Sequence, residues 1–407
     1  MLTSCLSSRQ ISKVMPMKVG IVAQHISLVL VLLSLCGCGG SSGNASNGGG
    51  QNPPATTEIL YASDVFNSIF AFNINQTSGA LTQTASVTPG GDFVGNSAIA
   101  ITPSGSYLYA VNDTSAGING YATNESGTLS LISGSPFPIL PAVQPSFPGV
   151  EAMAVDPTGR FLYAGSGAGF DGIASFSIDA SSGALTATGG PFSTGIGTIP
   201  AGIAINPAGT FLYATDQEQS VWAFTIDSQT GTLTSIAGSP FTAGSQPVGL
   251  QVDPSGEFLY VALSNSNSIA AFSIDSASGA LTTVPGSPFA TASTQFTQTY
   301  QLTIHPSGKF LYAFNFNGNT LAAFTINSTT GALSTIPGSP FAINPNAEGD
   351  LIVDPSGQFL YLTIGSSLSS AFVIFDIDPT TGAPTPNSQS PVAGDEEPSG
   401  LVAVQFQ

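Results

Sequence analysis

Along most of this chain, short runs in which hydrophobic and polar residues alternate are separated by segments rich in glycine, proline, serine and asparagine. Residues 254–289 show the full pattern, which is a Pro-Ser-Gly turn, the apolar run FLYVA, a polar loop, a second run SIAAFSID, a Ser-Gly turn, a third run ALTTV and the exit GSPF. Apolar runs of this length, rich in aromatic and β-branched residues and bounded by turn residues, predict antiparallel β-strands. Everything after about residue 58 is a variation on this unit.

A tyrosine in the first apolar run aligns the copies. It recurs as Tyr61, Tyr109, Tyr163, Tyr213, Tyr260, Tyr312 and Tyr361, which gives seven units. A unit of about 50 residues with four short strands is typical of one propeller blade. The sequence therefore predicts an all-β protein, a seven-bladed β-propeller of four-stranded antiparallel blades.

The innermost strand of each predicted blade lies just before the Pro-Ser-Gly turn. Such strands are expected at 97–101, 151–155, 201–205, 248–252, 300–304 and 349–353, whereas the first unit lacks one. The missing run appears at the other end of the chain as GLVAV, residues 400–404. We expect this C-terminal strand to complete the first blade and close the ring, which leaves no free sheet edge inside it.

A second recurring motif is I-[DN]-x-x-[ST]-G, and only the second unit departs from it, with Thr123 at the polar position. In the other units that position holds Asn75, Asp179, Asp227, Asp275, Asn327 and Asp378. Asp and Asn bond back to their own backbone, and glycine supplies the positive φ that such a turn needs. The motif lacks the alternating oxygen ligands of a calcium loop, so we expect a turn.

The N-terminal segment is typical of a secretion signal. Basic residues precede an apolar run at 26–35, and the string LCGCGG follows at 35–40. This string resembles the lipobox of bacterial lipoproteins, in which a small residue precedes the lipidated cysteine, and Cys38 fits that place better than Cys36. A plain signal with incidental cysteines is the alternative. The predicted division is 1–37 signal peptide, 38–57 acylated cysteine and flexible tether, and 58–407 propeller.

Charge and cysteine content exclude several kinds of site. Only 7% of residues are charged, and beyond the signal only Arg160 and Lys309 stand against all 23 acids. Such a surface repels nucleic acid and anionic lipid, so membrane attachment would rest on the acyl anchor at Cys38. All three cysteines lie in the first 38 residues, so residues 58–407 have no disulfide, zinc-thiolate site or cysteine nucleophile. We expect a monomeric, extracytoplasmic lipoprotein of the bacterial cell envelope.

The units resemble those of the seven-bladed lactonase family, which includes 6-phosphogluconolactonases. The stretch HPSGKFLYAFN, followed by LAAFTINSTTGALSTIPGSPF, at 305–341 carries the resemblance, which covers about residues 58–407. It implies the fold and a lactonase site in which a histidine, arginines and a glutamate hold an anionic lactone. Here His305 falls on a turn position that other units fill with Thr, Asn or Asp, and Arg160 and Lys309 fall on one that other units fill with Ser, Thr, Glu or Gln. We therefore expect all three on the face opposite the binding face.

Candidate ligand-binding residues remain at the mouth of the predicted central channel. Glu151 and Asp350 interrupt a ring of small residues there, and the neighbouring candidates are Asn96, Tyr300, Gln301 and Glu348. Carboxylates and amides in this place suit a neutral sugar or lactone, or a hydrated divalent cation such as calcium, with Glu151 and Asp350 as its possible ligands. A solvated acidic rim with no ligand is the alternative reading.

No catalytic residue can be assigned from the sequence, and no cofactor is implied apart from that cation. The residues favour a binding or interaction module with a degenerate lactonase-type site over an enzyme. Two alternatives stay open. One is a lactone hydrolase that converts a sugar lactone to an aldonate. The other is a passive surface or adhesion protein, whose partner would be another protein.

Overall fold

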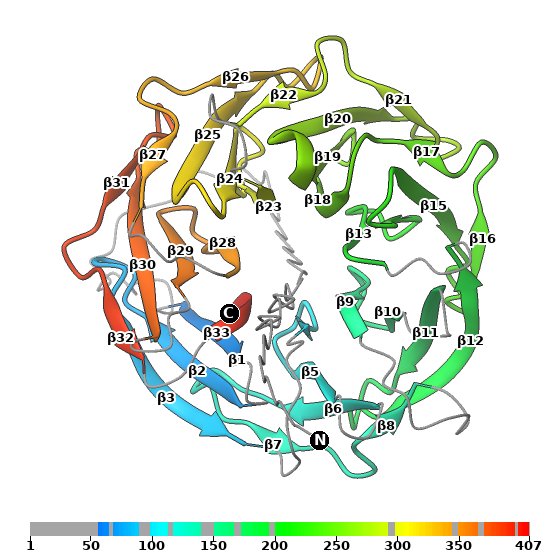
Figure 1. Cartoon of the computed structure of the whole chain (residues 1–407). Coiled ribbons are helices and arrows are strands. Elements are labelled where there is room, and N and C mark those ends of the chain that lie inside the picture. The colour runs from blue at the N-terminus through cyan, green and yellow to red at the C-terminus, as the bar shows by residue number, and fades with distance from the viewer. Residues whose placement is uncertain are drawn as a thin grey trace, which may run out of the picture.

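The structure, a computed structural model, describes residues 56–64, 68–88, 98–112, 117–139, 150–166, 172–194, 200–291, 298–343, 349–364, 370–394 and 398–406. Within these ranges the chain forms 33 strands and one short 3-10 helix, η1 (Ser264–Ser266). The strands make seven antiparallel sheets arranged as a ring (Figure 1). No helix in the described residues is long and apolar enough to cross a membrane.

Each sheet is one blade, and its innermost strand is given first here. Blade 1 contains β33 (Pro398–Phe406), β1 (Thr57–Asp64), β2 (Ile69–Ile74) and β3 (Leu81–Val87). Blade 2 contains β4 (Ile99–Ile101), β5 (Tyr107–Asn112), β6 (Gly117–Ala122), β7 (Ser130–Leu131) and β8 (Phe137–Pro138). Blade 3 contains β9 (Val150–Val155), β10 (Phe161–Ser166), β11 (Gly172–Ile178) and β12 (Leu185–Ser193). Blade 4 contains β13 (Ile203–Ile205), β14 (Phe211–Thr215), β15 (Ser220–Ile226), β16 (Leu233–Ser235) and β17 (Phe241–Thr242).

The remaining blades repeat this plan. Blade 5 contains β18 (Pro247–Val252), β19 (Phe258–Leu263), β20 (Ser268–Ile274), β21 (Leu281–Thr283) and β22 (Phe289–Ala290). Blade 6 contains β23 (Thr299–Ile304), β24 (Phe310–Asn315), β25 (Thr320–Ile326), β26 (Leu333–Thr335) and β27 (Phe341–Ala342). Blade 7 contains β28 (Leu351–Val353), β29 (Phe359–Ile364), β30 (Ser370–Ile377), β31 (Pro384–Pro386) and β32 (Val392–Gly394).

The C-terminal strand closes the ring, as the sequence predicts. β33 pairs with β1, with Tyr61 opposite Val402, and so supplies the innermost strand of blade 1. Figure 1 shows β33 beside β1 in the inner part of the ring. Chain ends far apart in sequence are thereby joined in one sheet. The predicted fold class is confirmed.

The outer strand is split in five blades, and the GSP motif accounts for the split. In blade 5, β21 and β22 both pair with β20, and Ser287 lies in the break between them. The Ser287 hydroxyl accepts a hydrogen bond of 2.9 Å from the Ala271 amide. The serines of the other three GSP motifs, and Ser390 of the Gln-Ser-Pro sequence in blade 7, accept the same bond from their own third strands. The motif therefore satisfies an amide that the interrupted strand leaves unpaired.

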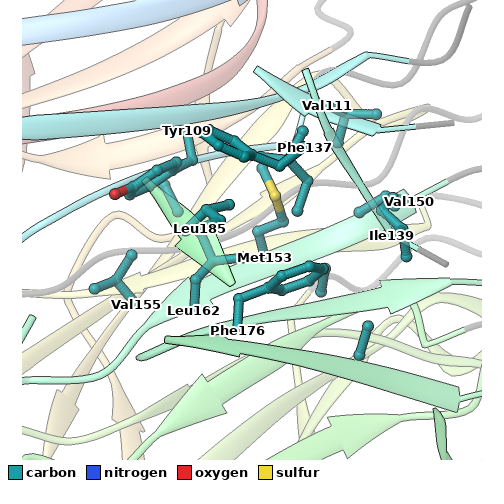
Figure 2. Close-up of a cluster of buried hydrophobic side chains, with 14 of the residues drawn as sticks. Tyr109, Val111, Phe137, Ile139, Val150, Met153, Val155, Leu162, Phe176 and Leu185 are labelled. Carbon is teal, nitrogen blue, oxygen red and sulfur yellow. The ribbon is translucent and has the colours of Figure 1, made fainter. Parts of the chain in front are cut away.

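The apolar core lies between the blades. Among the described residues, one cluster of buried side chains occupies each junction between neighbouring blades. Figure 2 shows the cluster between blades 2 and 3, where Val111 and Phe137 of one blade face Met153 and Phe176 of the other. Because every blade shares its core with two neighbours, the blades stabilise one another.

The tyrosine that aligns the repeats links each blade to the next. Tyr260 donates a hydrogen bond of 2.9 Å to the carbonyl oxygen of Gly331, the turn glycine of blade 6. Equivalent bonds run from Tyr109, Tyr163, Tyr213, Tyr312 and Tyr361. The last of these reaches Gly79 of blade 1 and so crosses the ring closure. Within the described residues Tyr61 makes no bond of this kind: its buried hydroxyl lies at the junction with blade 2, the one blade whose turn motif departs from the pattern.

The recurring Asp and Asn side chains form the turns that the sequence predicts. The Asp275 Oδ1 accepts hydrogen bonds from the amides of Ala277 and Ser278. Asp179, Asp227, Asp378, Asn75 and Asn327 accept the equivalent pair. These side chains are therefore occupied by their own backbone, as Asx turns require.

Candidate functional site

Two faces of the ring follow from the strand directions. In blades 2 to 7 the innermost strand runs into a Pro-x-Gly turn, where x is Ser, Thr or Ala, and we call the side that carries these turns the turn face. The second strands end and the innermost strands begin on the opposite side, which we call the loop face. Ligands of propellers and barrels are held by loops at strand ends, so the loop face is the side to search.

Glu151 is the second residue of β9, on the loop face, where it is half-buried. Its Oε2 accepts a hydrogen bond of 2.5 Å from the Nε2 of Gln217, which follows β14 in blade 4. Burial raises the pKa of Glu151 to about 7, and the bond from Gln217 opposes the rise. A carboxyl group with this pKa can accept or donate a proton near neutral pH.

Five amide residues of blades 4 to 6 adopt left-handed backbone conformations on the loop face. They are Gln217, Gln246, Asn267, Gln298 and Asn319, with φ between 46° and 59°, and they are the non-glycine residues with positive φ in the described chain. Such conformations cost of order 1–3 kcal/mol each and persist only where surrounding contacts fix them. We call this set the amide arc.

Hydrogen bonds hold the amide arc in place. The Ser264 hydroxyl donates to the Gln246 Oε1 over 3.0 Å, and the Gln298 amide donates to the Asn267 Oδ1 over 2.7 Å. The side-chain amide of Asn317 donates to the Gln298 Oε1 over 2.8 Å. These bonds join blades 5 and 6 along one side of the loop face. The side-chain oxygens of Gln246, Asn267 and Gln298 are thereby held in position.

Two aromatic rings lie within the amide arc. Tyr300 and Phe316, both half-buried, meet edge to face with ring centroids 5.7 Å apart. The Tyr300 hydroxyl is hydrogen-bonded to Ser264, and burial raises its pKa. Aromatic side chains with an apolar body and a polar end, placed among amides, are common in sites for polar small molecules.

Gln301 and Asp350 lie one position deeper along the innermost strands, and both are buried. A Cβ at Gly249 would stand 2.7 Å from the Gln301 Oε1, so the small residue makes room for this side chain. The Asp350 carboxylate accepts hydrogen bonds from the amides of Leu351 and Leu401, over 2.8 and 2.9 Å. Burial raises the pKa of Asp350 to about 7, and these two bonds oppose the rise. Asp350 thus joins blade 7 to the closing strand.

The described candidate residues come from three different blades. Glu151 bonds across the junction of blades 3 and 4, Tyr300 and Gln301 belong to blade 6, and Asp350 contacts β33. Asn96 and Glu348 lie outside the described residues, as does Cys38. No group of three or more His, Cys, Asp or Glu side chains in the described ranges could hold a metal ion. The calcium site stays a prediction.

The basic side chains lie on the turn face, as expected. Arg160 and Lys309 are exposed beside Pro-Ser-Gly-type turns. The His305 Nδ1 accepts a hydrogen bond from the Ser307 amide, so its Nε2 donates to the Gly357 carbonyl oxygen over 2.9 Å. Burial lowers the pKa of His305. Since residues 58–407 have no other Lys, Arg or His, the loop face has no cationic side chain.

Sequence reasoning missed part of the amide arc. The candidates from the sequence include Tyr300, which lies within the amide arc, but not Asn267, Gln298 or the neighbouring Phe316. Asparagine is enriched at positive φ, so Asn267 carried a usable signal within its polar loop. Gln298 carried none, because glutamine has no such preference.

Comparisons with known proteins agree with the geometry. The chain matches the family described as lactonase, 7-bladed beta-propeller, over residues 67–238, 193–292 and 287–398. A comparison with curated proteins gave no match. Among solved structures, a candidate 6-phosphogluconolactonase of Bacteroides fragilis is 21% identical, with a TM-score of 0.69 over 86% of this chain and 98% of that chain. The periplasmic gluconolactonase of Pseudomonas aeruginosa is 18% identical, with a TM-score of 0.65 over 86% of this chain and 99% of that chain. These structures are similar in fold, and the family match shows that this chain belongs to the seven-bladed β-propeller lactonase family.

Proposed function

We propose that this protein binds an uncharged, polyhydroxylated molecule on its loop face and acts as a binding module of the lactonase family. The observation that carries the proposal is the chemistry of that face. It presents a carboxyl group, the amide arc and two aromatic rings, whereas every basic side chain of residues 58–407 lies on the turn face. Amides hydrogen-bond hydroxyl groups, and an anionic phosphosugar would need cationic partners.

Calorimetric titration tests this selectivity. The probes are D-glucose, freshly dissolved D-glucono-1,5-lactone and glucose 6-phosphate. We expect the two neutral probes to bind and the phosphorylated one to bind more weakly. Glu151→Gln should weaken binding, whereas Glu257→Gln, an exposed glutamate of the turn face, should leave it unchanged. Tighter binding of the phosphate, or no binding of either neutral probe, would contradict the proposal.

Lactone hydrolysis is the second candidate, and the pKa of Glu151 favours it. An ionised Glu151 could take a proton from water as the oxygen attacks the lactone carbonyl carbon. The ring C–O bond then breaks, its oxygen takes up a proton, and a hydroxy acid results. Activity on gluconolactone should rise with pH through about 7, as Glu151 ionises, and should disappear in Glu151→Gln. If the rate with the protein equals that of spontaneous hydrolysis, both with and without calcium, the hydrolase proposal is refuted and only the binding proposal remains.

We further propose that the propeller is anchored outside the cytoplasm by acyl chains on Cys38. The lipobox-like string at 35–38 and the tether of residues 39–57 support this placement. Cells fed a labelled fatty acid should label the wild-type protein and Cys36→Ala but not Cys38→Ala. Label retained in Cys38→Ala would refute the anchor.

A further inference from the structure

The closing strand extends beyond the point where other innermost strands end. β33 continues to Phe406, so that Gln405 pairs with Glu58 at the turn face. Glu58 stands three residues before Tyr61, as Glu257 stands three residues before Tyr260. Glu257 is exposed, whereas Glu58 has no solvent-exposed surface. The ring closure therefore buries a carboxyl group that the other blades leave in water.

A second buried carboxyl group meets Glu58 across the junction. Asp354 follows β28 in blade 7, is fully buried, and its side chain is hydrogen-bonded to that of Glu58. Its Oδ1 also accepts a hydrogen bond of 2.7 Å from the Phe359 amide. Two ionised carboxylates have no hydrogen to share, so this contact needs one proton.

The Asp354 Oδ2 also accepts a hydrogen bond from the Ser356 hydroxyl, so both Asp354 oxygens act as acceptors and the remaining contacts favour a proton on Glu58. The Gln405 side-chain amide donates a hydrogen bond of 3.0 Å to the Glu58 Oε1. The Glu58 Oε2 is buried and accepts from no donor group. A proton on Oε2 that is donated to Asp354 satisfies both side chains. Burial, and then the charge of Asp354, raise the pKa of Glu58 to about 8.

Within the part of the chain that the structure describes, no cationic side chain compensates for this pair. His305 of blade 6 interacts with Asp354, but burial lowers its pKa and its Nε2 bonds Gly357. Tyr361 interacts with both carboxyl groups and with Asp376, and its hydroxyl donates to Gly79. Loss of the proton would thus leave two negative charges buried side by side, which is strongly unfavourable.

We propose that Glu58 and Asp354 share one proton across the junction of blades 1 and 7, and that this proton stabilises the pairing of β33 with β1 that closes the ring. The closure is a pH-sensitive device, which loosens as the solution becomes alkaline. It joins the first strand, the last strand and the last blade at one point. The stability of the sheet contacts at both termini of the propeller therefore depends on one protonation.

The direction of the pH effect follows from linkage. The pKa of Glu58 in the folded protein, about 8, lies above its ordinary value of 4.5. Between these values the folded chain retains a proton that the unfolded chain releases, so stability falls as pH rises. The contribution of the pair is complete below about pH 4.5 and is lost by about pH 8.

The test measures chemical unfolding between pH 5 and 8.5 for the wild type, Glu58→Gln and Glu257→Gln. A glutamine at position 58 can donate to Asp354 without a titrating proton. We expect its stability to fall less steeply with pH than that of the wild type, by about one proton per chain, and Glu257→Gln to follow the wild type. Asp350 and His305 also titrate, but they remain in all three proteins. Burial raises the pKa of Asp354 as well, so differences between the curves isolate the Glu58–Asp354 pair.

Asp354→Asn provides a second variant. Asn206 forms the same turn in blade 4, where its Oδ1 accepts from the Phe211 amide, so asparagine suits this position. Removing the Asp354 charge should shift the loss of stability to lower pH. Hydrogen exchange corrected for intrinsic rates should show β1 and β33 losing protection before β19 and β20 as pH rises in the wild type. Parallel stability curves for the wild type and Glu58→Gln, or equal loss of protection in both pairs of strands, would overturn the proposal.

Discussion

The substitution Gly79→Ala would test how the turn glycines join neighbouring blades. Gly79 has a φ of +71°, and a Cβ built there would stand 2.6 Å from Cδ1 and 2.8 Å from Cε1 of Phe359. Phe359 is only 4% exposed and is packed in the core between blades 7 and 1, so its ring cannot easily move away. The carbonyl oxygen of Gly79 also accepts the hydrogen bond from Tyr361, over 2.8 Å.

The loss of folding free energy expected for Gly79→Ala is the sum of a backbone contribution and a packing contribution. Placing alanine at positive φ costs about 1–2 kcal/mol. Forcing a methyl group into a filled core costs a further 1–3 kcal/mol, approximately. Gly308 is the matched control, because its φ is also +71° but the nearest atom to a Cβ, the Cδ of Pro254, is 3.6 Å away. Gly308→Ala should therefore show the backbone part alone.

Urea unfolding followed by circular dichroism would measure both variants against the wild type. We expect Gly79→Ala to lose about 2–5 kcal/mol and Gly308→Ala about 1–2 kcal/mol, with similar slopes of free energy against urea. The unfolded-state effect of replacing glycine is shared by the two variants and cancels in the difference. Equal destabilisation of the two would refute the claim that the glycine is needed for contact between blades.

Two further substitutions test single hydrogen bonds. Tyr260→Phe removes the 2.9 Å hydrogen bond from the tyrosine hydroxyl to the Gly331 carbonyl oxygen and should lower the free energy of unfolding by about 1–3 kcal/mol in the same assay. A change below about 0.5 kcal/mol would argue that this bond does not stabilise the junction of blades 5 and 6. Ser287→Ala leaves the Ala271 amide unpaired in the split outer strand and should cost a similar amount, about 1–3 kcal/mol, whereas the exposed Ser276→Ala should have almost no effect.

The sequence by itself determined the fold and the position of the basic side chains. Seven copies of one unit fix the strand alternation, and alignment on Tyr260 and its equivalents fixes which residues occupy the same place in each blade. The displaced run 400–404 predicted the closing strand, which β33 confirms. Alignment also placed His305 on the turn face, because local turn chemistry is set by neighbours in sequence.

Only the tertiary structure decided which side chains are buried and what they contact. Alignment makes Glu58 equivalent to the exposed Glu257, yet the continuation of β33 through Gln405 buries Glu58 against Asp354. The sequence makes Asp350 a candidate ligand residue, and the structure adds that its carboxylate accepts hydrogen bonds from two backbone amides, one of them in the closing strand. The residues that bury a side chain or hydrogen-bond to it come from blades distant in sequence. Alignment of the repeats cannot predict these contacts, because equivalent residues in different blades can have different neighbours.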